Sequence, residues 1–162
     1  MKYNSKNIIL IVSFLITSVI LQAQTTLFTQ TFGSSDIEQV GGLQTNTQQD
    51  IFVVGTFGDD FNIGNKTLIN NGIADIYISK INTNGETVWA KSAGSNDRDK
   101  VTGLQLFEDS ILYFSGTFWD NATFDNLSLS ATGNALFIAK YDTSGQAIWV
   151  EKITGTGLKN IE

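Results

Sequence analysis

Residues 74–89 read ADIYISKINTNGETVW, and residues 134–149 read NALFIAKYDTSGQAIW. Each stretch has an apolar run, then a polar segment that begins with Asn or Asp and contains Gly, then Trp. The identical positions lie 60 residues apart and include Lys80 and Lys140, Gly85 and Gly145, and Trp89 and Trp149. Short runs of β-branched and aromatic residues bounded by Asn, Asp and Gly are typical of β-strands joined by tight turns. The recurrence predicts a repeated β-unit.

The repeat extends upstream of these stretches, where the spacing becomes 61 residues. Gly55-Thr56-Phe57 recurs as Gly116-Thr117-Phe118, and Gly42-Leu43-Gln44 recurs as Gly103-Leu104-Gln105. Neither unit shows a 3.6-residue apolar period, so we predict an all-β fold. We expect four strands in each unit, at residues 40–44, 51–57, 75–81 and 88–92 in the first and at residues 101–107, 111–118, 135–141 and 148–152 in the second.

The third expected strand of each unit has a nearly continuous apolar centre, at residues 76–78 and 136–138. Runs of this kind are typical of strands that are covered on both faces. We therefore expect the sheets of neighbouring units to stack face to face.

The turn after this strand has the same chemistry in both units. It begins with Asn82 or Asp142, whose side chain can accept a hydrogen bond from the backbone two residues on. It ends with Gly85 or Gly145, and glycine takes a positive φ at little cost. This pattern predicts a tight hairpin.

Trp89 and Trp149 follow these turns, four residues after the glycine. They can pack between units, or they can stack on a sugar. Phe28 stands in the same place upstream of the first unit. This favours packing, because a core position accepts Phe for Trp more readily than a stacking site does.

The first 23 residues predict a cleaved secretory signal, with Lys2 and Lys6 before an apolar run at 8–21 and a small residue, Ala23, at the cleavage point. A membrane anchor is the alternative. The run is too short to cross a hydrocarbon core of about 30 Å, which needs about 20 residues. We therefore predict an exported protein, extracellular, at the cell surface or in the periplasm, with no membrane span after signal removal.

Charge and composition narrow the function classes. The chain has a net charge of −6, which becomes −8 once Lys2 and Lys6 leave with the signal. An acidic chain is a poor match for nucleic acid, where a basic face supplies most of the affinity. The sequence has no Cys and no His, which excludes thiolate chemistry and a Ser-His-Asp triad within this chain. Hydrolysis by paired carboxylates and binding of a hard cation remain open.

A longer polar connection joins the second and third strands of each unit, at residues 58–74 and 119–134. Each contains a few apolar residues, which predicts an extra short hairpin. Oxygen-bearing side chains recur there, and oxygen is the ligand that Ca²⁺ prefers. No cofactor is otherwise expected. The weak calcium candidates are Asp59, Asp60, Asn62, Asp120 and Asp125. The alternative is that these side chains cap turns on a solvated rim.

Two further stretches bear on function. Trp119 is the candidate for an exposed, glycan-stacking aromatic, because the first unit has Gly58 at that place. Asp97 and Asp99 belong to an alternating charge run at residues 95–100, which predicts a surface turn. No catalytic residue is identified.

The segments 75–85 with Trp89, and 136–145 with Trp149, resemble the β-propeller repeat of secreted bacterial proteins, the SBBP-type repeat. The upstream stretches 51–57 and 111–118 resemble its apolar run followed by Gly, Thr and an aromatic residue. The similarity covers the chain from about residue 28 to the end. It is shared more distantly with quinoprotein-like propeller repeats, and the signal and loops are similar to those of exported Bacteroidetes-type surface proteins.

The resemblance implies one four-stranded antiparallel blade per unit and defines no catalytic residues. We expect a partial blade at 28–34, unit one at about 35–92, unit two at about 93–152 and the start of a third at 153–162. A closed propeller typically needs about 4–8 blades. The chain is therefore expected to be a fragment of a longer propeller, a subunit that forms a ring with its copies, or a compact two-sheet module. Unpaired blade edges predict self-association.

The sequence thus predicts an exported, non-enzymatic β-propeller repeat scaffold that binds protein or glycan at the cell surface. The alternative is part of an extracellular carbohydrate-active hydrolase or lyase whose catalytic residues lie outside this chain. A purely structural spacer is the third hypothesis.

Overall fold

The computed structural model describes residues 32–36 and 38–153, which form eleven β-strands and no helix. The all-β prediction is confirmed. The predicted signal, Phe28 and the predicted start of a third unit after residue 153 lie outside the described residues. Within the described ranges, no helix is long and apolar enough to cross a membrane.

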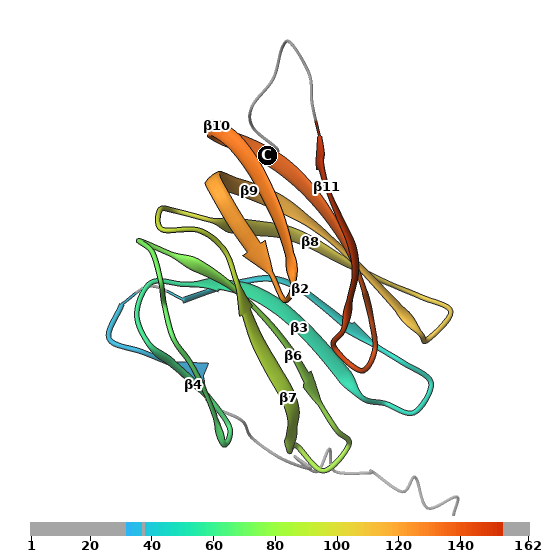
Figure 1. Ribbon diagram of the computed structural model, residues 1–162. Coiled ribbons are helices and arrows are strands. Elements are labelled where there is room, and N and C mark those ends of the chain that lie inside the picture. The colour runs from blue at the N-terminus through green and yellow to red at the C-terminus, as the bar shows by residue number, and fades with distance from the viewer. Residues whose placement is uncertain (1–31, 37, 154–162) are drawn as a thin grey trace, which may run out of the picture.

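Two four-stranded antiparallel sheets account for most of the structure (Figure 1). The first sheet contains, in order, β2 (Glu38–Thr45), β3 (Ile51–Phe57), β6 (Asp75–Ile81) and β7 (Thr87–Ala93). The second contains β8 (Lys100–Phe107), β9 (Ile111–Phe124), β10 (Leu127–Asp142) and β11 (Ala147–Ile153). All eight strands expected from the sequence are present, and in each sheet their spatial order follows their order along the chain.

The predicted extra hairpin is present in both units, in two forms. In the first unit, β4 (Phe61–Ile63) and β5 (Lys66–Leu68) form a small sheet with β1 (Phe32–Gly33). In the second unit, β9 and β10 continue into the hairpin, and their register shifts between Ser130 and Asn134.

The two large sheets stack face to face, and apolar side chains fill the space between them. The buried residues that the first sheet contributes include Phe52, Val54, Ile76 and Ile78, and those from the second include Leu112, Phe114, Phe137, Ala139 and Tyr141. The other face of the first sheet packs under the β4–β5 hairpin, through Phe57, Phe61, Ile63, Leu68 and Tyr77. The core therefore has two layers, one on each side of the first sheet.

The recurring Gly-Thr-Phe motif is explained by the close approach of both neighbouring strands at its glycine. A Cβ atom added to Gly55 would lie 2.2 Å from the carbonyl oxygen of Gln39 and 2.3 Å from Cε1 of Tyr77. One added to Gly116 would lie 1.9 Å from the carbonyl oxygen of Lys100 and 2.9 Å from Cε1 of Phe137. A backbone oxygen of one neighbouring strand and a large ring of the other thus leave room for a hydrogen atom only. This contact is the same in both sheets.

The prediction that the third strands are covered on both faces is confirmed for the first unit only. Ile76, Tyr77 and Ile78 are all buried. In the second unit Phe137 is buried, whereas Leu136 and Ile138 are half-buried. The physical reason is that the second sheet meets the first on one face, and no described residue covers its other face.

We expect Gly55→Ala to lower the free energy of unfolding by about 1–3 kcal/mol, because the added methyl overpacks against the Gln39 carbonyl oxygen and the Tyr77 ring. Gly103→Ala is the matched control, since a Cβ added to Gly103 has no neighbour within 4 Å. Urea unfolding of both variants at low protein concentration measures the difference. An equal effect of the two substitutions would show that the ring contact does not require glycine.

Candidate interaction surface

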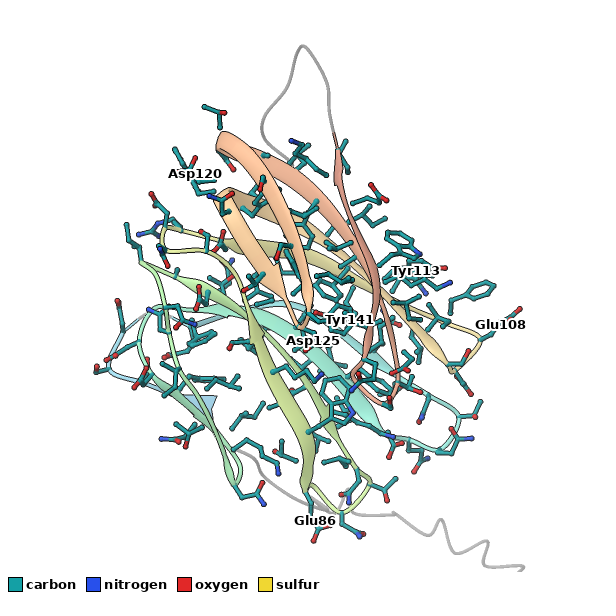
Figure 2. All side chains as sticks on the ribbon, viewed as in Figure 1. Glu86, Glu108, Tyr113, Asp120, Asp125 and Tyr141 are labelled. Atoms are coloured by element: carbon teal, nitrogen blue, oxygen red, sulfur yellow. The ribbon has the colours of Figure 1, made fainter. Side chains whose placement is uncertain are left out.

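The uncovered face of the second sheet, here called the outer face, carries a row of large side chains. It is formed by Gly103, Gln105 and Phe107 of β8, Tyr113, Ser115 and Thr117 of β9, Leu136, Ile138 and Lys140 of β10, and Trp149, Glu151 and Ile153 of β11. Figure 2 labels Tyr113 on this sheet. The rings of Tyr113 and Trp149 are 6.1 Å apart, and Lys140 Nζ lies 5.7 Å from the Tyr113 ring centroid. The lysine is within range of a cation–π interaction.

The first sheet has the same arrangement at the matching positions, where it is covered. Lys80 Nζ lies 5.6 Å from the Phe52 ring centroid, and the Phe52 and Trp89 rings are 6.4 Å apart. Phe52 is fully buried there, against the second sheet. The outer face thus repeats, at these three positions, an arrangement that the first sheet has on its covered face.

Trp89 packs onto the hairpin turn of the second unit. Its indole Nε1 donates a hydrogen bond to the carbonyl of Thr143 at 3.2 Å. A Cβ atom added to Gly145 would lie 3.0 Å from the indole, and Gly145 has φ of 86°. Trp89 therefore lies between the units. Trp149 is its counterpart on the outer face, and its ring contacts that of Tyr113.

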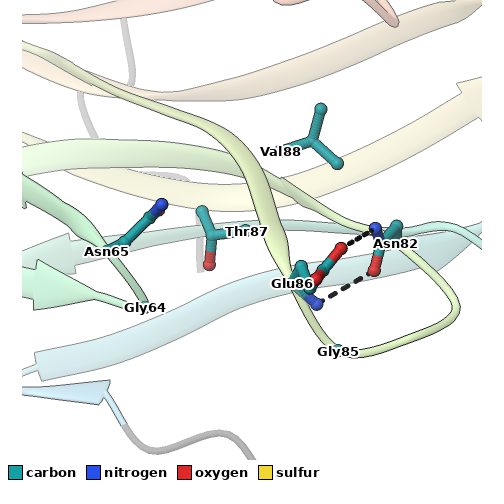
Figure 3. Close-up of a pocket in the computed structure, with 7 residues that line it drawn as sticks. All are labelled: Gly64, Asn65, Asn82, Gly85, Glu86, Thr87 and Val88. Atoms are coloured by element: carbon teal, nitrogen blue, oxygen red, sulfur yellow. Dashed lines mark hydrogen bonds between the residues drawn. The ribbon is translucent and has the colours of Figure 1, made fainter.

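The turns have the geometry that the sequence predicts. The Asp142 carboxylate accepts hydrogen bonds from the backbone N–H groups of Ser144 and Gln146, each at 2.9 Å. Partial burial alone would raise the pKa of Asp142, but these bonds and that from the Ser144 hydroxyl outweigh it and lower the pKa. In the first unit, Asn82 accepts from the Glu86 N–H at 2.9 Å and donates to its carboxylate at 2.8 Å (Figure 3).

A hollow of about 610 Å³ lies beside the first turn, between it and the tip of the β4–β5 hairpin (Figure 3). It is lined by Gly64, Asn65, Asn82, Gly85, Glu86, Thr87 and Val88. At the matching place in the second unit, Trp89 covers the turn, and Lys91 forms an ion pair with Asp125 at 2.8 Å. The hollow therefore matches a site that receives a β-strand elsewhere in the chain.

A second hollow, here called the polar groove, has a volume of about 330 Å³ at the junction of the two units. Its lining consists mainly of amide and hydroxyl side chains and comprises Asn71, Ser92, Ala93, Gly94, Ser95, Asn96, Asn121 and Thr123. Amides and hydroxyls both donate and accept hydrogen bonds, as the hydroxyl groups of a glycan do.

The calcium candidates of the first unit each close a turn or a loop. Asp59 accepts hydrogen bonds from the Ser35 hydroxyl and the Asp60 N–H, and the first of these is the main reason that its pKa is lowered. Asp60 accepts from the Asn70 N–H at 3.1 Å. Asn62 accepts from a hydroxyl, that of Thr67, at 2.8 Å.

The candidates of the second unit are also engaged by donors of the protein. Asp120 accepts from the Gly133 N–H at 2.8 Å, and Asp125 accepts from the Ala147 N–H at 3.0 Å beside its ion pair with Lys91. Figure 2 shows Asp120 and Asp125 well apart. In the ranges that the structure describes, no three Asp, Glu, His or Cys side chains gather. Calcium binding stays a prediction without a preformed ligand set.

Trp119 is half-buried near the end of the outer face. Its backbone N–H donates to Asp99 Oδ1 at 3.1 Å, which fixes this part of β9. A Cβ atom added to Gly133 would lie 3.7 Å from its ring. The indole thus rests against β10 and retains an accessible part.

The prediction that Asp99 belongs to a surface turn is wrong, because Asp99 is fully buried. It accepts hydrogen bonds from the Ser95 N–H and hydroxyl as well as from Trp119. The loop folds inward because its backbone also pairs with Ala74, whose carbonyl accepts the Asp99 N–H at 2.7 Å. Burial raises the pKa of Asp99 to about 6, although these hydrogen bonds act in the opposite direction.

Asp75 is a second buried carboxylate at the same junction. Its Oδ2 accepts the Asn71 N–H at 2.8 Å, and Oδ1 has no hydrogen-bond partner among the described residues. Burial raises the pKa of Asp75. A Cβ atom added to Gly94 would lie 2.5 Å from Asp75 Oδ1 and 2.6 Å from Asp99 Oδ2, so the two carboxylates share one glycine as neighbour. Both are sealed from solvent, which gives the pair a structural role.

The hydrogen bonds between Ser95 and the Asp99 carboxylate, here called the Ser95–Asp99 clasp, have a signal in the sequence. Ser95, Asp97 and Asp99 match Ser34, Asp36 and Glu38 in the 61-residue repeat. Glu38 accepts bonds from the Ser34 N–H and hydroxyl, as Asp99 does from Ser95. A serine that recurs with an acidic residue four positions later therefore indicates a local hydrogen bond between the two side chains.

No protein-family model matches the chain, and no curated protein matches it significantly.

We expect Trp89→Ala to lower the free energy of unfolding by about 3 kcal/mol or more, because it opens a cavity between the sheets. Trp149→Ala is the matched control. It should lower the free energy of unfolding by only about 1 kcal/mol, because Trp149 buries less apolar area against the protein than Trp89 does. Urea unfolding at low protein concentration measures both. Equal costs would contradict the difference in their environments.

The buried carboxylates predict a stability that depends on pH. Since the pKa of Asp99 in the fold, about 6, lies above its ordinary 3.8, its contribution is complete below about pH 4 and is lost as the pH rises through about 6. Asp75→Asn removes the neighbouring charge and places an amide donor beside Asp99. We expect this variant to be more stable than the parent at pH 7 by about 1 kcal/mol, with a smaller decline between pH 4 and 7.

Asp60→Asn is the control, because it removes the same charge from an exposed loop. Urea unfolding across this pH range distinguishes the two. If both variants show the pH profile of the parent, the buried pair does not govern it.

Proposed function

We propose that this chain is an exported, non-enzymatic β-propeller-type repeat scaffold that binds a glycan or a protein, with each four-stranded sheet as one blade. The observation that carries the proposal is the repeated stacking. In each sheet the strands follow chain order, and the first strands, β2 and β8, lie against each other where the glycines of β2 meet Val101 and Leu104 of β8. This is the order of strands within blades around an axis.

The polar groove supports a glycan as the bound molecule. Its amide and hydroxyl side chains come from the loops at the junction of the units and from the hairpin of the second unit. Loops on a repeated scaffold are where binding sites concentrate. Trp119 and Asn121 lie on the same strand, β9, so an aromatic surface and the polar groove are close along the chain. Aromatic rings stack on the apolar faces of sugars while hydroxyl groups are bound by amides.

The composition supports export and argues for a neutral partner. The predicted signal, the net charge of −8 without it and the absence of Cys and His remain the basis of this part. A hydrolase or lyase whose catalytic residues lie outside this chain is the alternative. The raised pKa values of Asp75 and Asp99 do not favour it, because neither carboxylate is accessible to a substrate.

We expect the purified chain to be retained on host extracellular polysaccharide without releasing soluble sugars, measured in one tube. Trp119→Ala should weaken retention about fivefold, the loss of about 1 kcal/mol expected for one aromatic contact. Val88→Ala is the control, since Val88 is an exposed apolar side chain on the first sheet. Product formation would overturn the non-enzymatic function, and unchanged retention of Trp119→Ala would remove Trp119 from the site.

A further inference from the structure

The two ends of the sheet stack can be compared with the interface that joins the sheets inside the chain. Inside the chain, β2 and β8 approach so closely that the backbone of β2 contacts side chains of β8. A Cβ atom added to Gly42 would lie 2.6 Å from the Leu104 Cβ, and one added to Gly41 would lie 2.7 Å from Val101 Cγ1. Val101 is 2% exposed and Leu104 packs against the core. The interface therefore inserts apolar side chains of β8 against glycines of β2.

Three of these residues have counterparts at the two ends of the stack, where no described residue makes the matching contact. Val40 and Leu43 are the counterparts of Val101 and Leu104 in the repeat, and they are 59% and 55% exposed. At the opposite end, Gly103 is the counterpart of Gly42, and a Cβ atom added there has no neighbour within 4 Å. One end thus has the apolar side chains. The other has one of the two glycines that such side chains cover, since Thr102 stands at the place of Gly41.

The last strands give a second, independent match. Trp149 on the outer face is the counterpart of Trp89, whose indole is bound by the turn of the second unit. The corresponding turn of the first unit, residues 82–85, borders the 610 Å³ hollow. Trp149 at one end of the stack and the turn at residues 82–85 at the other are therefore the two halves of the contact that Trp89 makes with the turn of the second unit.

Charge also fits. Inside the chain, Lys91 of β7 pairs with Asp125 at the tip of the second hairpin. Glu151 stands at the place of Lys91, and Gly64 stands at the place of Asp125, with Lys66 two residues further along the first hairpin. The outer end thus carries an acid, and the opposite end carries a base near the matching place.

We propose that a second copy of this chain docks on the outer face. It presents Val40, Leu43 and the turn at residues 82–85 of its first sheet. The contact uses sheet faces and differs from the edge pairing predicted from the sequence. It is head to tail, so an open assembly has one unoccupied face at each of its two ends until a ring closes. With two sheets in each copy, about 4–8 blades correspond to two to four copies. The inference rests on the blade-type stacking of the proposed function and is independent of glycan binding.

The test uses one substitution at each end. Gly103→Glu blocks the outer face, and Leu43→Glu blocks the opposite end. Both should fold, because Gly103 has open space around its missing side chain and Leu43 is more than half exposed. Sedimentation velocity over a wide concentration range should show discrete oligomers for the parent chain and monomers for each variant alone. An equal mixture of the two variants should give a one-to-one dimer and nothing larger, because a single intact interface remains.

Every other result overturns the proposal. A parent chain that stays monomeric would assign the outer face to another occupant, such as a further repeat unit in a longer polypeptide. Oligomers of Leu43→Glu alone would indicate two outer faces in contact. A mixture that stays monomeric would exclude head-to-tail docking. Circular dichroism confirms that each variant is folded, and retention on polysaccharide, measured separately, shows whether the proposed function stands when the assembly fails.

Discussion

The close approach of β2 and β8 is the constraint on which the rest of the structure depends. Gly41 and Gly42 let the backbone of one sheet touch Val101 and Leu104 of the next, so the first strands are the point of least separation. Because β-sheets twist, sheets that meet at one strand diverge toward the other. Trp89, the largest side chain type, fills the wider gap at β7, where its indole is bound by Thr143. Small residues at one side and a large one at the other determine the angle between the sheets.

Polar groups hold the same junction at the cost of burying charge. Asp99 joins the loop after β7 to β9, and its acceptor oxygens are satisfied by three donor groups. Asp75 nearby leaves one oxygen without a partner. Burial without a basic partner is unfavourable for a carboxylate, which explains why the pKa of each is raised. The hydrogen bonds to Asp99 therefore fix how the sheets join. The two buried carboxylates also make the stability of this junction sensitive to pH.

Local pattern was sufficient to predict the strands, the turns and the extra hairpin, because these depend on residues that are near in sequence. The turn at Asp142 and Gly145 is an example, since its hydrogen bonds lie within five residues. The burial of Asp99 could not be predicted in this way, because it depends on Ala74 and Trp119, which lie far away in the chain. A charge run has the same appearance in sequence whether it faces water or a neighbouring sheet.

The third strand of the second unit was predicted to be covered on both faces, but only one of its faces is covered. The repeat gives the two units the same side chains, whereas the burial of each side chain depends on which neighbours its own sheet has. Ile138 repeats Ile78, yet Ile78 is buried between two sheets and Ile138 lies on the outer face. Tyr113, Lys140 and Trp149 keep the mutual geometry of Phe52, Lys80 and Trp89, although no described sheet lies above them. Large apolar side chains that gather on one accessible face are typical of interaction sites in soluble proteins. The proposed docking of a second copy accounts for this face, and it uses the exposed Val40 and Leu43 as the complementary end.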